Sequence, residues 1–562
     1  MNIGNMRDKI KISLIEILEK LGIENPKIEL EHPEDILHGD FSTNIALVYA
    51  KELKINPKVL AEKIINSIGD IENIERIEIA GIGFINFRIK DSYFFNNILK
   101  IKESYGKNNL DKNKEIMVEY TDPNPFKVFH IGHLMANTIG ESLSRIVEFS
   151  GAEVIRACYQ GDVGLHVAKT IWAILKDENK KSNIEYLGKM YVLGNEKYEI
   201  DENAKKEIIE INKKIFEKSD EKINKIYKEG RDLSLEYFDT IYRRLGTKFD
   251  EFFFESEVAE DGLKIVKEFL KKGIFEESDG AIIFHGDKYG EHTRVFINSQ
   301  GLPTYEAKEI GLIKNKFKKY PNLNESIVVT ANEQSDYFKV IIASLKVMYP
   351  DIAVKMKHIS HGILRPSSGK MSSRKGNVVS ADDLISEFEV LVKEKIKDRE
   401  FNKDEYNEVL NDVSISALKY TILHQAIGGD IIYDPKKAVS FEGDSGPYLQ
   451  YATVRANAVI VKARENNISE KVETLPEKVD LLERLLIRFP EIIERSRLEY
   501  APHYIVTYLI ELSSAFNSYY ANNQIIDKNN SLSPYRIALT KVFVQVMKSG
   551  LWILGIKVPG RM

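Results

Sequence analysis

Two histidines three residues apart, His130 and His133, are the residues of this chain whose types and spacing first indicate chemistry. They stand in the stretch NPFKVFHIGHL (124–134), with Gly132 between them and Lys127 just upstream. Imidazole rings can bind a metal ion, move a proton or donate hydrogen bonds to phosphate oxygens. Each of these tasks needs different neighbours, so the surrounding sequence has to distinguish them.

A metal site is the first possibility, because histidines at i and i+3 can share one helix face. A zinc site needs a further ligand, and the neighbouring sequence offers no obvious one. Cys158 is the only cysteine, which excludes a disulfide within the chain and a cysteine-rich zinc site. We therefore expect no protein-bound metal, and we expect Cys158 to be a small buried hydrophobic residue.

A structural role is the second possibility, because histidine can cap a helix or satisfy a buried carbonyl group. The flanking elements favour a third possibility, which is phosphate binding. EIMVEYTD (115–122) has the composition of a strand, Pro123 and Pro125 end it, and a helix begins near Phe129 or His130. Free N–H groups and the positive end of the helix dipole gather at such a junction, which suits a phosphate group.

These features together predict a triphosphate site. Gly132 removes a side chain where a flat ring or a phosphate could come close. His130 and His133 would donate hydrogen bonds to oxygen atoms as charge builds, and Lys127 would supply a fixed cation.

A second motif, GKMSSRKGNVV (369–379), lies far downstream. HIGH, at 130–133, is the nucleotide-binding signature of class I aminoacyl-tRNA synthetases and related nucleotidyltransferases, and the downstream motif resembles the KMSK loop of the same class. The resemblance implies that ATP is a substrate and that Mg²⁺ is carried with it. The implied ATP contacts come from both motifs: Phe129, His130, Gly132, His133, Lys370, Met371, Ser372 and Ser373.

Members of this class join an amino-acid carboxylate to the α-phosphorus of ATP, expel pyrophosphate and pass the acyl group to a tRNA ribose hydroxyl. Such chemistry depends on holding reactants in line and neutralising charge more than on acid or base groups. The resemblance assigns this work to five residues: Lys127, His130, His133, Lys370 and Arg374.

The downstream motif departs from the pattern of many class members. Ser373 stands where the second lysine of KMSKS is usually found. That loss is common in the arginyl-tRNA synthetases, in which a lysine just before the histidine signature is thought to take over the charge, and Lys127 occupies that position. The alternative for Lys127 and Arg374 is a pair of solvated surface cations.

Five stretches resemble arginyl-tRNA synthetases in particular, and they extend over nearly the whole chain: HPEDILHGDFSTNIA with AGIGFINFRI, VEYTDPNPFKVFHIGHL, GLPTYEAKEIGL, FEGDSGPYLQYATVRANAVI and the final GLWILGIKVPGRM. The resemblance implies an arginine–tRNA ligase that activates L-arginine with ATP and transfers it to the 3′-terminal ribose of tRNA(Arg). It also implies that tRNA must be present for activation.

A guanidinium group is recognised by carboxylates and by an aromatic face. The positions that match the family supply such groups, together with amides for the amino and carboxylate ends of arginine: Glu119, Asn124, His130, Tyr305, Glu309 and Gln334. Tyr305 and Glu309 are four residues apart and share a helix face. A surface helix pair is the alternative for these two.

Two departures affect this assignment. Glu309 stands where the family usually has aspartate, so its carboxylate reaches one methylene farther or makes no contact with arginine. Tyr337 stands where a histidine is often found, close to Gln334.

We expect a multidomain α/β protein. Residues 1–105 read as a small α+β domain, which in the family contacts the tRNA elbow. Residues 114–402 form a Rossmann-like catalytic domain with a doubly wound parallel sheet. Residues 403–562 form an all-α domain that resembles the anticodon-binding domain of the arginyl- and cysteinyl-type enzymes.

The catalytic domain is interrupted by a charged helical stretch at about 172–262, which we interpret as an insertion of unassigned role. The sheet pattern then resumes with three short β-rich segments, GAIIF (280–284), TRVFIN (293–298) and ESIVVT (325–330).

In the helical C-terminal region, YLIELSSAFNSYYANNQI carries three aromatic residues that could stack on unpaired bases: Phe516, Tyr519 and Tyr520. Core packing is the alternative, because aromatic residues at helical spacing are usually buried. We expect only one or two of them to contact tRNA.

The composition is that of an ordinary soluble globular protein, with 43% hydrophobic and 29% charged residues. The net charge of −5 argues against indiscriminate nucleic-acid binding, although local runs of basic residues are still compatible with RNA binding. No apolar run of about 18 residues exists to span a membrane, and the N-terminus lacks the apolar core of a signal peptide. We expect a monomer in the cytoplasm whose partners are tRNA(Arg), L-arginine and ATP.

Two other functions remain open. A cysteinyl-tRNA synthetase is disfavoured, because those enzymes hold their substrate on zinc and this chain has a single cysteine. A non-catalytic RNA-binding relative would have lost the phosphate-binding residues, yet His130, His133, Lys127 and Lys370 are all present.

Overall fold

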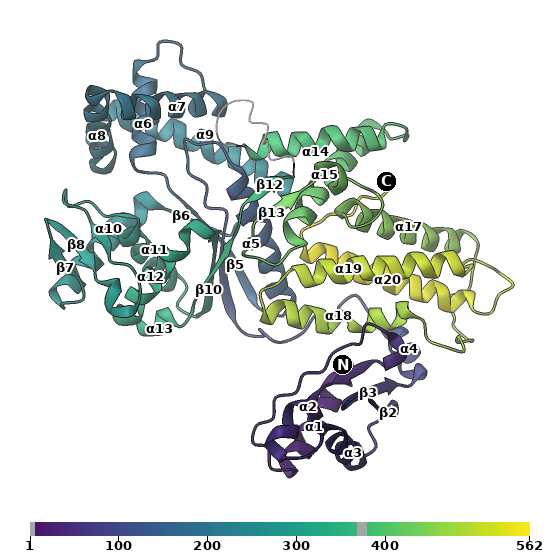
Figure 1. Cartoon of the computed structure of the whole chain (residues 1–562). Coiled ribbons are helices and arrows are strands. Elements are labelled where there is room, and N and C mark those ends of the chain that lie inside the picture. The colour runs from purple at the N-terminus through teal and green to yellow at the C-terminus, as the bar shows by residue number, and fades with distance from the viewer. Residues whose placement is uncertain (1–5, 368–378) are drawn as a thin grey trace. The chain divides into compact units, whose positions relative to one another are not determined.

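A computed structural model describes residues 6–367 and 379–562 of the chain (Figure 1). The chain forms two compact units. One comprises Met1–Glu103, Val459–Arg488 and Tyr519–Val542, and the other comprises Ser104–Ala458, Phe489–Ser518 and Phe543–Met562. Segments from both ends of the chain therefore contribute to the first unit.

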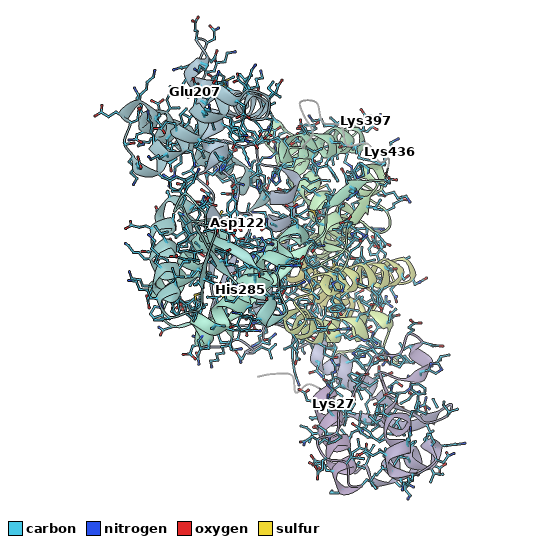
Figure 2. All side chains as sticks on the ribbon, turned by 60° about the vertical axis from the view of Figure 1, so that its left-hand side comes forward. Lys27, Asp122, Glu207, His285, Lys397 and Lys436 are labelled. Atoms are coloured by element: carbon cyan, nitrogen blue, oxygen red, sulfur yellow. The ribbon has the colours of Figure 1, made fainter. Side chains whose placement is uncertain are left out.

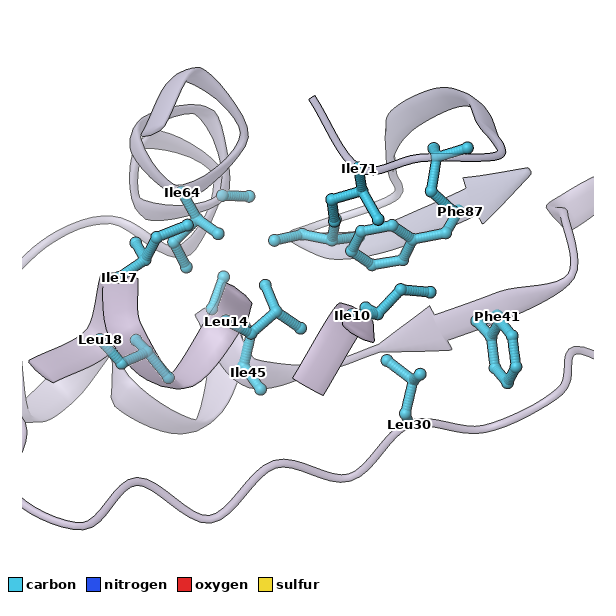
Figure 3. Close-up of a cluster of buried hydrophobic side chains, with 14 of the residues drawn as sticks. Ile10, Leu14, Ile17, Leu18, Leu30, Phe41, Ile45, Ile64, Ile71 and Phe87 are labelled. Atoms are coloured by element: carbon cyan, nitrogen blue, oxygen red, sulfur yellow. The ribbon is translucent and has the colours of Figure 1, made fainter. Parts of the chain in front are cut away.

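The first unit contains a three-stranded antiparallel sheet of order β1-β3-β2, with β1 (Phe41–Thr43), β2 (Ile74–Ala80) and β3 (Phe84–Ile89). Its N-terminal helices are α1 (Met6–Lys20), α2 (Ile45–Leu53), α3 (Pro57–Ser67) and α4 (Asp91–Ile98). Apolar residues at helical spacing on α1, such as Leu14 and Ile17, pack in one hydrophobic cluster with Phe41 and Phe87 of the sheet (Figure 3).

A buried arginine joins the C-terminal part of this unit to its sheet. Arg484 lies in α18 (Leu481–Leu498) and pairs with Asp40 and, at 3.5 Å, with Asp91. Asp40 also accepts a hydrogen bond from the Ile89 N–H at 2.8 Å. The cluster thus connects α18 to the N-terminal part of the unit. Removal of Arg484 would leave Asp40 buried without a counter-charge, which is strongly destabilising.

The second unit contains a five-stranded parallel sheet of order β11-β10-β4-β5-β6. Its strands are β4 (Glu115–Glu119), β5 (Glu153–Gln160), β6 (Glu251–Phe254), β10 (Leu323–Ala331) and β11 (Met356–His361). From β4 the chain first adds β5 and then β6 on one side of the sheet. It later adds β10 and then β11 on the other side of β4. This confirms the predicted doubly wound sheet and places the change of direction at the carboxyl end of β4, where such folds bind ligands.

The helical stretch expected at 172–262 is shorter than predicted. It consists of α6 (Leu165–Lys176), α7 (Ile184–Ile200), α8 (Glu202–Glu217) and α9 (Glu221–Leu245), which together form the helical segment (Figure 1). Residues 251–254, which the sequence placed within it, form β6 and pair in parallel with β5. A four-residue strand between charged helices has too little periodicity to be recognised locally.

Two predicted strands also belong elsewhere. Residues 281–284 and 294–297 do not join the parallel sheet but form a separate antiparallel sheet of β7 (Glu276–Ser278), β8 (Ala281–Phe284) and β9 (Arg294–Ile297). The connections between these strands are short, and short connections can join only antiparallel neighbours. The third predicted strand, 325–330, lies within β10 of the parallel sheet as expected.

Helices complete the second unit around its sheets. The part that carries the parallel sheet contains α5 (Ile131–Phe149), α10 (Glu255–Lys271), α11 (Tyr305–Lys319), α12 (Ser335–Met348), α13 (Pro350–Ala353) and α14 (Ala381–Ile396). A two-stranded sheet pairs β12 (Leu364–Pro366) with β13 (Ile431–Tyr433). Cys158, on β5, is fully buried as predicted.

The C-terminal third is almost wholly helical, as predicted. Its helices are α15 (Lys403–Leu423), α16 (Pro435–Ala438), α17 (Gly446–Glu465), α18, α19 (His503–Asn522) and α20 (Ser533–Ile553). Within residues 6–367 and 379–562, no helix is both long and apolar enough to cross a membrane.

Candidate active site

The loop between β4 and α5 has an unusual backbone. Thr121, Asp122 and Phe126 have φ angles of 84°, 46° and 69°, which residues other than glycine rarely adopt. The loop is held by hydrogen bonds from the Tyr159 N–H to Asp122 Oδ1 (2.7 Å) and from the Phe126 N–H to Ser234 Oγ (2.9 Å). Figure 2 marks Asp122. A strained loop held in this way is typical of a functional site.

The two histidines cap the helix that follows this loop. The N–H groups of Gly132 and His133 donate to His130 Nδ1 (3.1 and 3.4 Å), and the His130 N–H donates to His133 Nδ1 (3.2 Å). Because each Nδ1 accepts hydrogen bonds, it must be unprotonated, and the neutral ring carries its proton on Nε2. The rings stack with their centroids 3.5 Å apart, and the cap leaves the Nε2–H group of each ring as a donor.

Both rings are held in the neutral form. Burial, followed by the nearby Lys127 cation, lowers the pKa of His130 to about 4. Burial, followed by His130 and Lys127, lowers the pKa of His133 well below its usual value. At neutral pH the pair therefore donates hydrogen bonds without carrying a charge.

The neighbouring residues Phe129 and Gly132 support the histidine pair, and their predicted contacts with ATP stay predictions. Phe129 is fully buried and packs edge-on against the ring of His133, with 5.2 Å between the ring centres. Its side chain therefore supports that histidine and is not exposed to a ligand. A Cβ on Gly132 would lie 3.0 Å from His130 Cε1. The glycine therefore makes room for the capping ring, in addition to any space it leaves for a ligand.

The backbone around the histidines pairs with the last residue of the second motif and with the residues just after it. The Ile131 N–H donates to the Val379 carbonyl (3.2 Å), and the Ala381 N–H donates to the Phe129 carbonyl (2.8 Å). The remaining predicted ATP and catalytic residues lie outside the described residues: Lys370, Met371, Ser372, Ser373 and Arg374. The chain that leaves this motif is thus bonded directly to the histidine signature.

Lys127 is half-buried, and its Nζ lies 5.0 Å from the centre of the Tyr191 ring. Burial, followed by repulsion from Lys169, lowers its pKa. The structure therefore does not support the alternative of a freely solvated surface cation for this residue.

An acidic cluster lies at the carboxyl end of β4. Glu119 is buried, and its carboxylate lies 2.7 Å from Lys316 Nζ. Burial, followed by Glu119, raises the pKa of Glu309 to about 8, and the same two causes raise the pKa of Asp122 well above its usual value. Buried carboxyl groups that repel one another favour a cationic ligand.

Two other predicted arginine contacts, Tyr305 and Gln334, lie at the starts of α11 and α12. Tyr337 donates its hydroxyl to the Tyr305 carbonyl (3.1 Å) and lies 3.5 Å from Glu309 Oε2, which links α11 to α12. The Tyr305 side chain is exposed, with Lys308 Nζ 5.0 Å from its ring centre. Gln334 is exposed at the start of α12. Its place relative to a bound arginine therefore stays a prediction.

Asn124 lies against the loop that follows β5. A Cβ on Gly161 would approach Asn124 Oδ1 to 2.3 Å and Glu255 Oε1 to 3.3 Å. The glycine is therefore required by this close approach, and the amide of Asn124 lies near the acidic residues of α10.

Sequence reasoning missed several polar residues near this site. Glu255 and Lys308 form a buried ion pair at 2.9 Å. Asp162 accepts hydrogen bonds from Ser256 Oγ and Tyr227 Oη, both at 2.7 Å. The Tyr159 hydroxyl is buried and has no hydrogen-bond partner among the described residues. The position of 159–162 at the carboxyl end of β5 was the signal that could have revealed this group.

The C-terminal aromatic residues are mostly part of the protein core. Phe516 is fully buried and stacks on Phe543 at 4.0 Å between ring centres, and Tyr519 is also buried. This burial favours the alternative of core packing for these two residues, in line with the expectation that only one or two of the three contact tRNA. Tyr520 is half-buried and packs beside a cluster that includes Ile525, so it remains the candidate for a base contact.

We expect Phe516→Ala to lower the free energy of unfolding by about 3–5 kcal/mol, because it leaves a cavity where two rings stack. The affinity of the folded fraction for tRNA should not change. Denaturant titration and filter binding measure these two quantities. Tyr520→Ala is the matched variant: we expect weaker tRNA binding and a smaller loss of stability. If Phe516→Ala weakened tRNA binding without loss of stability, its assignment to the core would be wrong.

Family models match nearly the whole chain. Residues 5–89 match the arginyl tRNA synthetase N-terminal domain, residues 95–434 match the catalytic domain of class I (R) tRNA synthetases, and residues 449–562 match the DALR anticodon-binding domain.

Curated relatives are similar over the same length. The chain is 32% identical to an arginine–tRNA ligase of Fusobacterium nucleatum, covering 93% of each protein, and 31% identical to one of Borrelia hermsii, covering 98% of this chain and 99% of the relative. The solved arginyl-tRNA synthetase of Thermus thermophilus has the same fold, with a TM-score of 0.81, 22% identity, and coverage of 99% of this chain and 100% of that one.

Proposed function

The chain belongs to the arginyl-tRNA synthetase family, and on that premise we propose how its histidine pair, acidic cluster and C-terminal helices divide the work of an arginine–tRNA ligase. The enzyme activates L-arginine with ATP, releases pyrophosphate and transfers arginine to the 3′-terminal ribose of tRNA(Arg). The assignment of each step to particular residues is our proposal.

The stacked histidines contact the phosphates of ATP through their Nε2–H groups. This proposal is supported by the cap geometry, which fixes the tautomer before the substrate arrives, and by the low pKa of both rings. Donors held in place in a partly buried site stabilise developing charge without having to reorganise. Because the two rings are neutral, the negative charge of the phosphates must be neutralised by nearby cations.

Those cations are Lys127 and, by family resemblance, Lys370 and Arg374. Because Ser373 replaces the second lysine of the downstream motif, Lys127 supplies the missing charge. Met371 and Ser372 contact ATP by the same resemblance. Mg²⁺ enters with ATP as part of the substrate.

The acidic cluster binds the arginine side chain, and one observation carries this proposal. Glu309 is buried beside Glu119 with a pKa raised to about 8, and Lys316 already pairs with Glu119. A guanidinium group would give Glu309 the cationic partner that its surroundings favour, through paired planar hydrogen bonds. Tyr305, Asn124 and Gln334 surround the rest of the amino acid.

The terminal regions bind tRNA. We propose the domain limits 1–105, 114–402 and 403–562, with the first domain at the tRNA elbow and the last at the anticodon. The anticodon assignment is supported by the match of residues 449–562 to the DALR domain. We further propose a monomer that works in the cytoplasm and requires tRNA for the activation step.

Arginine-dependent exchange between ATP and labelled pyrophosphate tests the proposal. We expect exchange with arginine when tRNA is present, and little without tRNA. Exchange with cysteine but not arginine would overturn the assignment of the acidic cluster. If no amino acid supported exchange under either condition, a binding protein without catalytic activity would replace this proposal.

A further inference from the structure

The helical segment α6–α9 has no role in the steps above, yet it directly supports the strained loop. Phe126 is fully buried and belongs to one hydrophobic cluster with Trp172 of α6 and Leu187 of α7. A Cβ on Gly230 of α9 would approach the Phe126 ring to 2.2 Å. The residue before Lys127 is therefore enclosed by three helices of the segment. Glu207, marked in Figure 2, lies on the fourth helix, α8.

The residue after Lys127 rests on the same segment. A Cβ on Gly188 of α7 would lie 3.3 Å from Val128 Cγ1. Farther along this helix, a Cβ on Gly194 would approach the Lys169 carbonyl of α6 to 2.1 Å, so α7 is packed backbone against backbone on its neighbour. The position of α7 beneath the loop is therefore closely determined.

Tyr191 lies one turn beyond Gly188 on this helix and presents its ring to Lys127 Nζ at 5.0 Å. The pKa of Tyr305 is raised by partial desolvation of its hydroxyl group, then by Glu255 and by Tyr191, so Tyr191 lies near the predicted arginine-binding ring as well. The ring is thus held by a rigid helix between the signature loop and the start of α11.

We infer that Tyr191 is a positioning residue for Lys127. Its ring face attracts the ammonium group and limits the flexible lysine stem to the conformation that points toward the histidine pair. Lys127 needs such support, because burial and Lys169 both oppose its charge. This inference rests on the proposed role of Lys127 in arginine activation, and it assigns a role to the helical segment.

The same helix offers a matched comparison. The ring of Tyr198 lies 4.1 Å from Lys169 Nζ and 5.8 Å from Lys205 Nζ, so it makes the same kind of contact away from the signature loop. If aromatic contacts on α7 served only to stabilise the helix, substitution of either tyrosine would have similar consequences. If Tyr191 acts through Lys127, only its substitution slows activation.

The test measures arginine-dependent pyrophosphate exchange, with tRNA present, in the full-length enzyme. We expect Tyr191→Leu to lower kcat by about threefold to thirtyfold, the range expected for loss of one partly buried cation–π contact. The KM for arginine should change little. Tyr191→Phe keeps the ring and should retain activity, and Tyr198→Leu should leave kcat unchanged. Tyr191→Met repeats the experiment if the leucine variant does not fold.

A double-mutant cycle with Lys127→Ala decides the mechanism. We expect Tyr191→Leu to have no further effect once Lys127 has been removed. An additional loss in that background would show that Tyr191 acts by another route and would overturn the inference, as would a Tyr191→Leu enzyme with normal kcat. A Lys127→Ala enzyme with normal kcat would instead contradict the proposed function of Lys127, which is a distinguishable failure.

Discussion

Glu309→Gln is expected to raise the arginine concentration required for half-maximal pyrophosphate exchange by about a hundredfold or more, the cost of losing one partner of a buried charge pair. The substitution keeps the shape of the side chain but removes the charge that would meet the guanidinium group. Steady-state exchange at saturating ATP and tRNA measures the effect. The KM for ATP should stay within about twofold of its original value, because the same charge does not face the phosphates.

The pH dependence of arginine binding is a second test of the contact between Glu309 and arginine. The pKa of Glu309 is raised to about 8 by burial and by Glu119, so below pH 8 its carboxyl is mostly protonated in the empty site. The guanidinium group stays charged over this range and favours the ionised carboxylate. Arginine binding should therefore release a proton near pH 7, and its affinity should rise with pH up to about 8 and then level off.

Calorimetry in two buffers of different ionisation enthalpy detects this released proton, which Glu309→Gln should abolish. Glu306→Gln, on the same helix and paired with Arg294 at 3.1 Å, is the matched control and should leave the arginine KM unchanged. Glu309→Asp tests the added methylene directly. A Glu309→Gln enzyme with normal arginine KM and normal proton release would show that this residue does not contact arginine.

Lys127→Ala is expected to lower kcat for arginine activation by about a hundredfold, the loss seen when one preorganised group that stabilises the transition state is removed. The affinity for tRNA should be nearly unchanged, because the lysine lies in the loop that carries the histidine signature. Exchange kinetics and filter binding with labelled tRNA measure the two quantities separately.

Lys176→Ala provides the control for a general effect of lost charge. This lysine forms an exposed pair with Glu207 at 2.9 Å on the same unit, so neither kcat nor tRNA affinity should respond. Equal losses of activation and tRNA affinity in Lys127→Ala would mean that the lysine serves RNA binding, and the assignment to the phosphates would have to be withdrawn.

The start of the signature helix could be predicted from the sequence because local interactions determine it. Pro123 and Pro125 end the strand, and the side chain of His130 accepts the first free N–H groups, so α5 begins where the sequence indicated. The parallel sheet was also predictable, since β4 and β5 are apolar, closely spaced and separated by one helix. Burial of Cys158 followed from its place in the second of these strands.

Features that depend on distant partners were not predictable in this way. β6 has four residues and is recognisable only by its pairing with β5. Phe516 and Tyr519 lie on a helix whose sequence suits either solvent or a core, and packing partners from other segments decided that both are buried. Gly132 was expected to make room for a ligand, but it also makes room for the ring of His130, which depends on the cap geometry.

The sequence alone was enough to predict the family, the histidine pair and the strand–helix–strand succession around it, because these depend on recognisable motifs and on residue types at short spacing. Only the tertiary structure decided the state of the site. Lys316 meets Glu119, and Tyr191 meets Lys127, across long separations in the chain. The charge of Glu309 depends on its burial beside Glu119. Burial and long-range proximity arise only when the sheet and helices pack, so no single stretch of residues encodes them.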